Sequence, residues 1–200
     1  YHHPASFCLA LEPLSIVTPA DSLERMLKGQ SPQSPTFGDG VDCPLFVTFK
    51  IQDRNGYMQL RGCIGTLSPT PLRNLARYVE KSAFQDRRFN PITEGELERL
   101  EVGVSLLVAY EEAGDPFDWE VGTHGILIDF TDKSGRGYGA TYLPEVMPEQ
   151  GWDQREAVES LMRKAGYRGR IDDSILSTMK TTRYQSSKAA MTYEEYATGS

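Results

Sequence analysis

The chain has 200 residues, of which 39% are hydrophobic and 24% are charged, and its formal net charge is −7 at pH 7. That length can bury a substantial core in one domain or in two closely packed subdomains, and the composition is typical of a soluble globular protein. No segment approaches the roughly 18 consecutive apolar residues of a membrane span. The acidic charge also argues against a protein that coats nucleic acid or an anionic membrane by electrostatics alone, so we expect neither as the main partner.

The three cysteines, Cys8, Cys43 and Cys63, are widely spaced. They form neither the paired framework of a disulfide-rich domain nor the close pair of a zinc site, and we expect no metal and no cofactor. Unpaired thiols are typical of a reducing compartment, which predicts an intracellular protein of the cytoplasm or nucleus. Because the first residue is Tyr1 and not methionine, we allow for a targeting segment ahead of it.

The first predicted element is a helix between Thr18 and Gly29. Thr18 is its expected cap, Pro19 lies in its first turn, and Gly29 ends it. Its apolar stripe consists of Leu23, Met26 and Leu27. Residues 29–40 are rich in Ser, Pro, Gln and Gly and are expected to form an exposed connection.

A β-hairpin is predicted next. Alternating apolar residues mark its first strand: Leu45, Val47, Phe49 and Ile51. Asn55-Gly56 would supply the positive φ angles of a tight turn, and residues 57–66 would form the returning strand. Strict alternation places Leu60 and Gly62 on one face of that strand and Cys63 on the other, unless a bulge at Gly62 changes the parity.

A helix is expected to begin at Thr70-Pro71, with apolar residues at helical spacing: Leu72, Leu75, Ala76, Val79 and Ala83. Because its amino terminus lies only a few residues after Cys63, the positive end of its dipole could reach the thiol. Thr93 and Glu96 form a capping box for a short helix that leads into a strand over residues 102–108.

The last third of the chain continues with strands near 126–130 and 138–142, joined by the turn 132–135. Asp153 then caps a helix that ends at Gly166. Four of its residues are expected to face inward: Ala157, Val158, Leu161 and Met162. Hairpin strands with segregated helices predict an α+β fold in which helices flank an antiparallel sheet.

The segment Leu60-Arg61-Gly62-Cys63-Ile64-Gly65 places one thiol between two glycines inside a predicted strand. A glycine within a strand marks a bulge, or a place where another backbone or a ligand comes close. The guanidinium of Arg61 would favour the thiolate, so one interpretation is an approachable, activated sulfur. The other interpretation is a buried cysteine in a strand that needs glycines to bend.

Few other residues suit chemistry. His124, which directly precedes Gly125, is either an open base or simply a turn residue. If it meets Cys63 in space, the two would form a thiolate–imidazolium pair. Asp86 and Arg88 either lock their own turn by a salt bridge, or orient His124 or bind a carboxylate substrate.

The segment from Arg163 to Lys188 is basic although the whole chain is acidic. It carries seven basic residues against two aspartates. This pattern is either one solvated face or a docking patch for an acidic partner or phosphate.

The hexapeptide resembles the signature of the AMMECR domain family. Further blocks follow in that family's order: Asp86-Arg87-Arg88-Phe89-Asn90-Pro91, Val104-Ser105-Leu106-Leu107, His124-Gly125-Ile126, Tyr142-Leu143-Pro144-Glu145-Val146, Glu149-Gln150-Gly151-Trp152-Asp153 and Arg163-Lys164-Ala165-Gly166. The sequence Leu143-Pro144-Glu145-Val146 is more similar to that of eukaryotic members. The resemblance implies an AMMECR domain over residues 44–197, preceded by a helical segment and connection over 1–43 and followed by a tail at 198–200.

The resemblance implies more about fold than about activity, because the family's biochemical function is not established. In a binding or accessory role, the protein would dock a protein or small-molecule partner in a groove. The residues expected to line this groove are Leu60 to Gly65, Arg88, Phe89 and Glu145. Alternatively, a thiol-dependent enzyme would use Cys63 as nucleophile or modification carrier, with His124 and Asp86. We favour the binding role, because the sequence offers one cysteine and one histidine but no evident third residue to orient the histidine, as nucleophilic catalysis usually requires.

Overall fold

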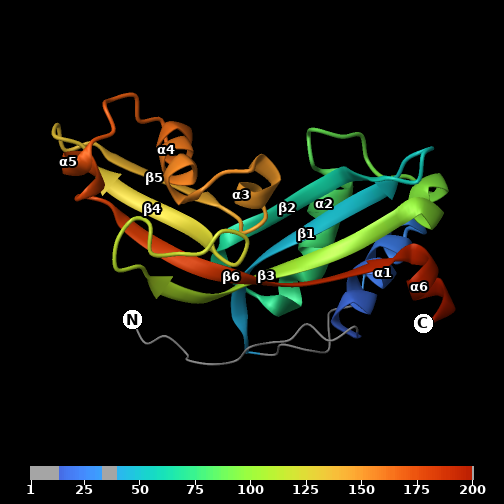
Figure 1. Ribbon diagram of the computed structural model, residues 1–200. Helices are drawn as coiled ribbons and strands as arrows, with labels where there is room; N and C mark the ends of the chain where they lie inside the picture. Colours follow the sequence, from blue (N-terminus) through green and yellow to red (C-terminus); the bar gives the residue numbers. More distant parts are fainter. Residues whose placement is uncertain (1–13, 33–39, 200) are drawn as a thin grey trace. The chain divides into compact units, whose positions relative to one another are not determined.

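A computed structural model describes residues 14–32 and 40–199 (Figure 1). The chain divides into two compact units. The first unit contains the described residues up to Leu107 together with residues 187–199, and the second contains residues 108–186. Among the described residues, no helix is long and apolar enough to span a membrane.

Six strands are hydrogen-bonded in the order β2-β1-β3-β6-β4-β5. Their bounds are β1 Asp42–Gln52, β2 Met58–Pro71, β3 Leu100–Glu112, β4 Gly125–Thr131, β5 Gly137–Tyr142 and β6 Lys180–Thr192. β1 pairs antiparallel with β2 and β3, and β4 pairs antiparallel with β5 and β6. The predicted α+β class, with an antiparallel sheet and flanking helices, is confirmed.

Short helices connect and flank the strands. Their bounds are α1 Leu14–Leu27, η1 Leu72–Asn74, α2 Leu75–Phe84, η2 Glu94–Arg99, α3 Val146–Gln150, α4 Gln154–Lys164, α5 Asp173–Leu176 and α6 Tyr193–Thr198. Thr93 precedes η2 with its capping box, and Asp153 caps α4 by accepting the backbone N–H of Glu156 at 2.8 Å. Both caps were predicted from the sequence.

The core of the first unit lies between β1 and α2, which also packs on β2 and α1. Leu45, Val47 and Phe49 are fully buried, as their alternation predicts. The apolar stripe of η1 and α2 covers them with Leu72, Leu75, Val79 and Ala83. Burial of this stripe is what makes a short helix stable here, because isolated helices of this length are marginal in water.

The second unit has its own core. α4 buries the four predicted side chains, and they meet the apolar face of β4 in one cluster. The cluster is completed by residues from the segments around them, including Trp119, Met147, Ile175, Leu176 and Met179.

The structure corrects the predicted start of the first helix and the predicted hairpin turn. α1 begins at Leu14 and contains Pro19, so Thr18 is not its cap. In the hairpin, Gly56 alone has a positive φ angle (86°), because the turn spans Asp53 to Gly56 and Asn55 takes an ordinary conformation. The Asp53 carboxylate accepts the backbone N–H groups of Asn55 and Tyr57, at 2.8 and 3.0 Å. This capped turn with a glycine at its last position is a common three- to five-residue hairpin design.

The predicted alternation along β2 is also wrong at Leu60. Phe49 pairs with Gly62, but the next residue, Lys50, pairs with Leu60, so one residue of β2 is inserted between them. Such a bulge changes the parity of the strand. Leu60 therefore shares the face of Lys50 and is 43% exposed, whereas Gly62 lies on the buried face with Phe49.

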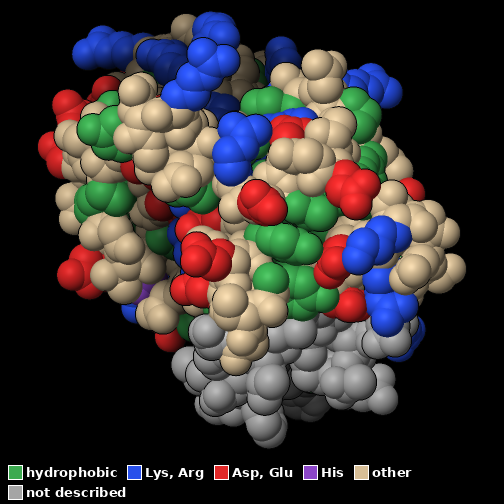
Figure 2. Space-filling model, turned by 90° about the vertical axis from the view of Figure 1, so that its right-hand side faces the viewer, with side chains coloured by type: hydrophobic (Ala, Val, Ile, Leu, Met, Phe, Trp, Pro, Cys, Tyr) green, Lys and Arg blue, Asp and Glu red, His purple; other side chains and the backbone are tan. Residues whose placement is uncertain are grey.

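The surface reflects the acidic composition. Figure 2 shows acidic and hydrophobic side chains intermixed over the middle of one face, and many basic side chains gathered at the upper edge of that view. On this face, basic side chains are therefore most numerous at one edge, although single basic side chains also lie elsewhere in the view.

Candidate functional site

The hexapeptide lies on an edge strand, since β2 ends the strand order. On the outer side of β2, the backbone N–H of Cys63 donates to Asp86 at 3.0 Å. The carbonyl oxygen of Cys63 accepts from Arg88 Nη2 at 3.1 Å. These two side chains therefore satisfy backbone groups that an edge strand would otherwise expose to unwanted pairing.

Asp86 is only 6% exposed and accepts hydrogen bonds on both carboxylate oxygens. Arg88 donates to it from Nη2 at 2.7 Å and from Nε at 3.0 Å. The Arg88 guanidinium, helped by the backbone N–H of Cys63, holds the pKa of this carboxyl well below its usual range. Asp86 is thus a structural acceptor that is charged at neutral pH, and it accepts the backbone N–H of Cys63.

Arg61 fastens the same segment to β2. Its guanidinium forms a two-nitrogen pair with Glu96, at 2.7 and 3.2 Å. It also donates to the carbonyl oxygens of Asn90 and Pro91, at 2.8 and 3.2 Å. The expectation that Arg61 favours the Cys63 thiolate is therefore not supported, because its donors serve these acceptors.

The two glycines of the hexapeptide are required by backbone packing. A Cβ atom on Gly62 would lie 2.3 Å from the carbonyl oxygen of Ser82 in α2. A Cβ atom on Gly65 would lie 2.3 Å from the carbonyl oxygen of Leu45 and 2.4 Å from the ring of Phe46. The approach expected at Gly62 is thus made by α2 of this chain.

The sulfur of Cys63 lies on the other face of β2 and is half-buried. It accepts a hydrogen bond from Thr48 Oγ1 at 3.2 Å. The predicted influence of a helix amino terminus is wrong, because β2 continues to Pro71 before the helix begins, roughly 20 Å or more along the strand at about 3.3 Å per residue. The last turns of α2, near Ser82, lie beside the motif instead, and that end of a helix dipole does not favour an anion.

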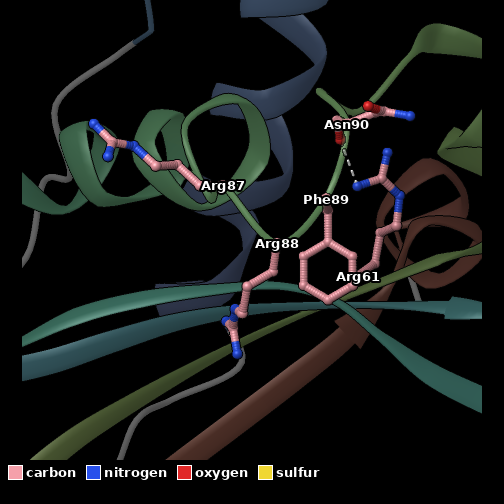
Figure 3. Close-up of a pocket in the computed structure, with 5 residues that line it drawn as sticks. All are labelled: Arg61, Arg87, Arg88, Phe89 and Asn90. Atoms are coloured by element: carbon pink, nitrogen blue, oxygen red, sulfur yellow. Dashed lines mark hydrogen bonds between the residues drawn. The ribbon is translucent and has the colours of Figure 1, made fainter.

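A hollow of about 440 Å³ opens beside these contacts, lined by Arg61, Arg87, Arg88, Phe89 and Asn90 (Figure 3). Arg88 lies over the ring of Phe89, 5.4 Å from its centroid. Arg87 is exposed and makes no hydrogen bond or ion pair with any residue that the structure describes. Sequence reasoning missed Arg87, although its lack of a carboxylate at turn spacing is a usable signal.

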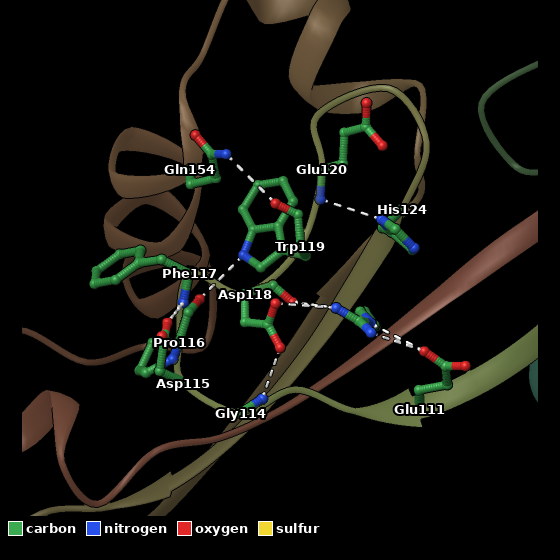
Figure 4. A network of polar contacts seen from close by, with 11 residues as sticks. Glu111, Gly114, Asp115, Pro116, Phe117, Asp118, Trp119, Glu120, His124 and Gln154 are labelled. Carbon is green, nitrogen blue, oxygen red and sulfur yellow. Dashed lines mark hydrogen bonds and ion pairs between the residues drawn. The ribbon is translucent and has the colours of Figure 1, made fainter.

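His124 and Glu145 belong to the second unit, whereas Cys63, Asp86 and Arg88 belong to the first. The predicted thiolate–imidazolium pair and the place of Glu145 in the groove therefore stay predictions. His124 closes a turn, because its Nδ1 accepts the backbone N–H of Glu120 at 3.1 Å (Figure 4).

Figure 4 also shows what stabilises the loop before His124. Arg183 pairs with Glu111 at 2.9 Å and with Asp118 at 3.1 Å. Asp118 in turn accepts the backbone N–H of Gly114 at 3.0 Å. One cation of the basic segment is thus structural, holding a loop against β3 and β6.

Within residues 14–32 and 40–199, no three His, Cys, Asp or Glu side chains are grouped as a metal site requires. Cys43 is buried and donates its thiol hydrogen to the carbonyl oxygen of Leu107 at 3.3 Å. Burial raises the pKa of this thiol to about 11. Cys8 lies outside the described residues.

The geometry can be compared with known proteins. The AMMECR1 family model matches residues 14–189. The chain belongs to the AMMECR1 family. An uncharacterised Arabidopsis thaliana protein is 44% identical over 178 residues, which is 88% of this chain and 83% of that protein. An uncharacterised Schizosaccharomyces pombe protein is 49% identical over 154 residues, 76% of this chain and 77% of that one.

Structural comparison agrees with this membership. The crystal structure of an uncharacterised protein from Pyrococcus horikoshii has a TM-score of 0.66 and 25% sequence identity, covering 88% of this chain and 89% of that one. The predicted membership of the AMMECR family is therefore confirmed. These relatives are themselves uncharacterised, so membership brings a fold and no activity.

Proposed function

We propose that this AMMECR1-family protein is a binding or accessory protein, and that it docks an acidic segment of a partner in the hollow beside the Leu60–Gly65 strand. The observation that carries the proposal is the contrast among three arginines of one hollow. Arg61 and Arg88 are neutralised by Glu96 and Asp86, whereas Arg87 has no partner within the described chain.

The surroundings of Arg87 suit recognition. The backbone on both sides of the hollow is fixed, because Arg61 and Arg88 fasten residues 86–91 to β2. A site fixed in advance loses less conformational entropy on binding. The half-buried ring of Phe89 lines the same hollow and offers an apolar contact. A partner segment that presents a carboxylate next to an apolar side chain matches both features.

The test is a titration of 15N-labelled protein with a hexaglutamate peptide, followed by amide chemical shifts. We expect saturable shifts at Arg87, Phe89 and Asn90. Arg87→Ala should weaken binding roughly three- to tenfold, the range for one partly exposed charged contact.

Arg77→Ala is the matched control, since Arg77 is an exposed arginine on α2 outside the hollow. It should leave the titration unchanged, and a hexalysine peptide should give no shifts at these residues. If Arg87→Ala and Arg77→Ala weaken binding equally, the hollow is not the docking site and only net charge is being measured.

A second candidate function is thiol-dependent chemistry at Cys63, which one contact favours. The Thr48 hydroxyl donates to the sulfur, and a hydrogen bond to a charged form stabilises it. Thr48→Val keeps the side-chain size but removes this donor, so it should slow alkylation of Cys63 by iodoacetamide at neutral pH. An unchanged rate would remove the one contact in favour of an activated thiol.

A further inference from the structure

A second hollow, of about 530 Å³, lies wholly within the second unit. One wall is the β4–β5 turn from Asp132 to Tyr138, and the other is the loop from Gly166 to Ile175 that follows α4. Four basic side chains line it: Lys133, Arg136, Arg168 and Arg170. Two of them belong to the basic segment singled out by sequence, and the docking role proposed above uses none of the four.

The two carboxylates that line the hollow accept hydrogen bonds from its own walls. Asp132 accepts hydrogen bonds from the backbone and hydroxyl of Ser134, at 2.8 and 2.6 Å, and from the hydroxyl of Tyr138 at 3.0 Å. Led by the Ser134 hydroxyl, these donors lower its pKa to about 2. Asp172 accepts the backbone N–H of Ile175 at 3.2 Å as the cap of α5.

The basic side chains of the hollow have no carboxylate within salt-bridge distance in the part of the chain that the structure describes. None of the four forms a salt bridge with a described residue. Arg168 donates to the carbonyl oxygen of Arg163 at 3.1 Å, and Arg136 lies over the ring of Tyr138, 5.1 Å from its centroid. Lys133 is near enough to Asp172 to help lower the pKa of that carboxyl.

The loop that carries Arg168 and Arg170 is held in one shape. Arg163 Nη1 donates to the carbonyl oxygens of Tyr167 and Gly169, at 3.1 and 2.8 Å. The Tyr167 hydroxyl donates to the carbonyl oxygen of Arg170 at 3.0 Å. The ring of Tyr167 is so close to Gly169 that a Cβ there would lie 2.4 Å from the hydroxyl oxygen. The backbone that carries these two arginines is therefore held in place before any ligand binds, despite the repulsion between their charges.

We infer that this hollow binds a small anion carrying two or more phosphate groups. Four cations against two carboxylates leave a net positive lining, and guanidinium groups match phosphate oxygens in pairs. The volume lies within the range of small-ligand sites, roughly 300 to 1,000 Å³.

The aromatic residues around the hollow pack against one another, so we assign ligand recognition to the cations. The ring of Tyr138 is stacked on Phe130, with centroids 5.2 Å apart, and Arg136 covers it as well. Tyr167 meets both rings edge-on. Tyr138 thus has an aromatic and a cationic partner, and Tyr167 packs against both rings, which favours a compact phosphate compound over a single-stranded nucleic acid that needs open rings for stacking.

The experiment is a titration of 15N-labelled protein with pyrophosphate, orthophosphate and hexaglutamate at one ionic strength. Pyrophosphate should bind most tightly and should shift amides within 132–138 and 166–175. Lys133→Ala combined with Arg170→Ala should weaken it about tenfold or more, since hydrogen bonds to charged groups are among the strongest single contacts. Lys180→Ala, an exposed lysine of β6 outside the hollow, should change the affinity less than about twofold.

Gly169→Ala tests the shape separately from the charge. It keeps every cation but forces Tyr167 away, so it should also weaken pyrophosphate binding, with thermal unfolding used to show that the variant is folded. Equal affinities for the three probes, or full affinity in the double variant, would overturn the inference. Shifts confined to Arg87, Phe89 and Asn90 would overturn it too, while leaving the other site standing.

Discussion

The carboxylate of Asp86 accepts a hydrogen bond from the backbone nitrogen of Cys63, 3.0 Å away. This contact joins two sequence blocks that lie 23 residues apart. Together with Arg88 it covers the outer edge of β2 at Cys63, the candidate nucleophile of the sequence analysis. The first consequence concerns stability, because a buried carboxylate with several donors is costly to remove.

Asp86→Ala should lower the free energy of unfolding by about 2 to 4 kcal/mol, because it leaves the Cys63 N–H and the Arg88 guanidinium unpaired. Urea unfolding measures the loss. Arg87→Ala is the control, because Arg87 is one residue away, is exposed and has no partner among the described residues, so the change should alter stability by less than about 0.5 kcal/mol. Equal losses in the two variants would contradict the structural role of Asp86.

Acid should destabilise the protein partly through Asp86. Its pKa in the folded state is depressed, so its stabilisation is complete above the unfolded value of about 3.9 and is lost as the pH falls below it. Asp86→Asn does not titrate, so its unfolding free energy should fall less steeply between about pH 5 and pH 2.5. Parallel curves for the two proteins would show that Asp86 is not a major acid-sensitive group.

Gly62→Ala should destabilise the protein by about 3 kcal/mol or prevent folding, because its Cβ would meet the Ser82 carbonyl oxygen. The cause is packing against α2, and it would act whether or not a ligand binds. Gly95→Ala has nothing within 4 Å of the new atom and should be neutral or slightly stabilising. Thermal unfolding compares the two, and a neutral Gly62→Ala would show that α2 can move aside.

Cys63 should be alkylated before Cys43 in the folded protein. Cys43 is 7% exposed, and burial raises the pKa of its thiol to about 11, so little thiolate is available at neutral pH. Mass spectrometry after iodoacetamide treatment measures both rates, in a Cys8→Ser background. Labelling of Cys43 at the rate of Cys63 would mean that the first unit opens readily.

Ala109→Gly should stabilise the protein by about 1 kcal/mol. Ala109 has a φ angle of 53°, a left-handed conformation that disfavours a side chain by about 1 to 2 kcal/mol. Ala190→Gly, at an exposed strand position without positive φ, should instead destabilise by roughly 0.5 to 1 kcal/mol. Denaturant unfolding of both variants gives the comparison, and a destabilising Ala109→Gly would contradict the assigned strain.

Periodicity and capping chemistry are properties of neighbouring residues, and for that reason the sequence predicted them well. The alternation of β1, the stripe of α2 and the capped α4 all have the buried faces that were expected. The predicted start of α1 was wrong, because α1 begins at Leu14 and contains Pro19. A Thr-Pro pair is favoured at a helix start, but it is also tolerated inside a helix when tertiary packing outweighs propensity.

The sequence by itself determined the α+β class, the family and the position of the hexapeptide on a strand. Only the tertiary structure decided what surrounds that strand. Gly62 allowed a bulge in the sequence, but only the strand register shows that the bulge lies opposite Phe49 and Lys50 and which side chains share a face. Likewise, Arg61 and Arg87 are the same kind of residue in sequence, but one meets a carboxylate 35 positions away and the other meets none that the structure describes. Contacts between distant segments assign a charge to structure or leave it for a ligand, because attraction depends on separation in space.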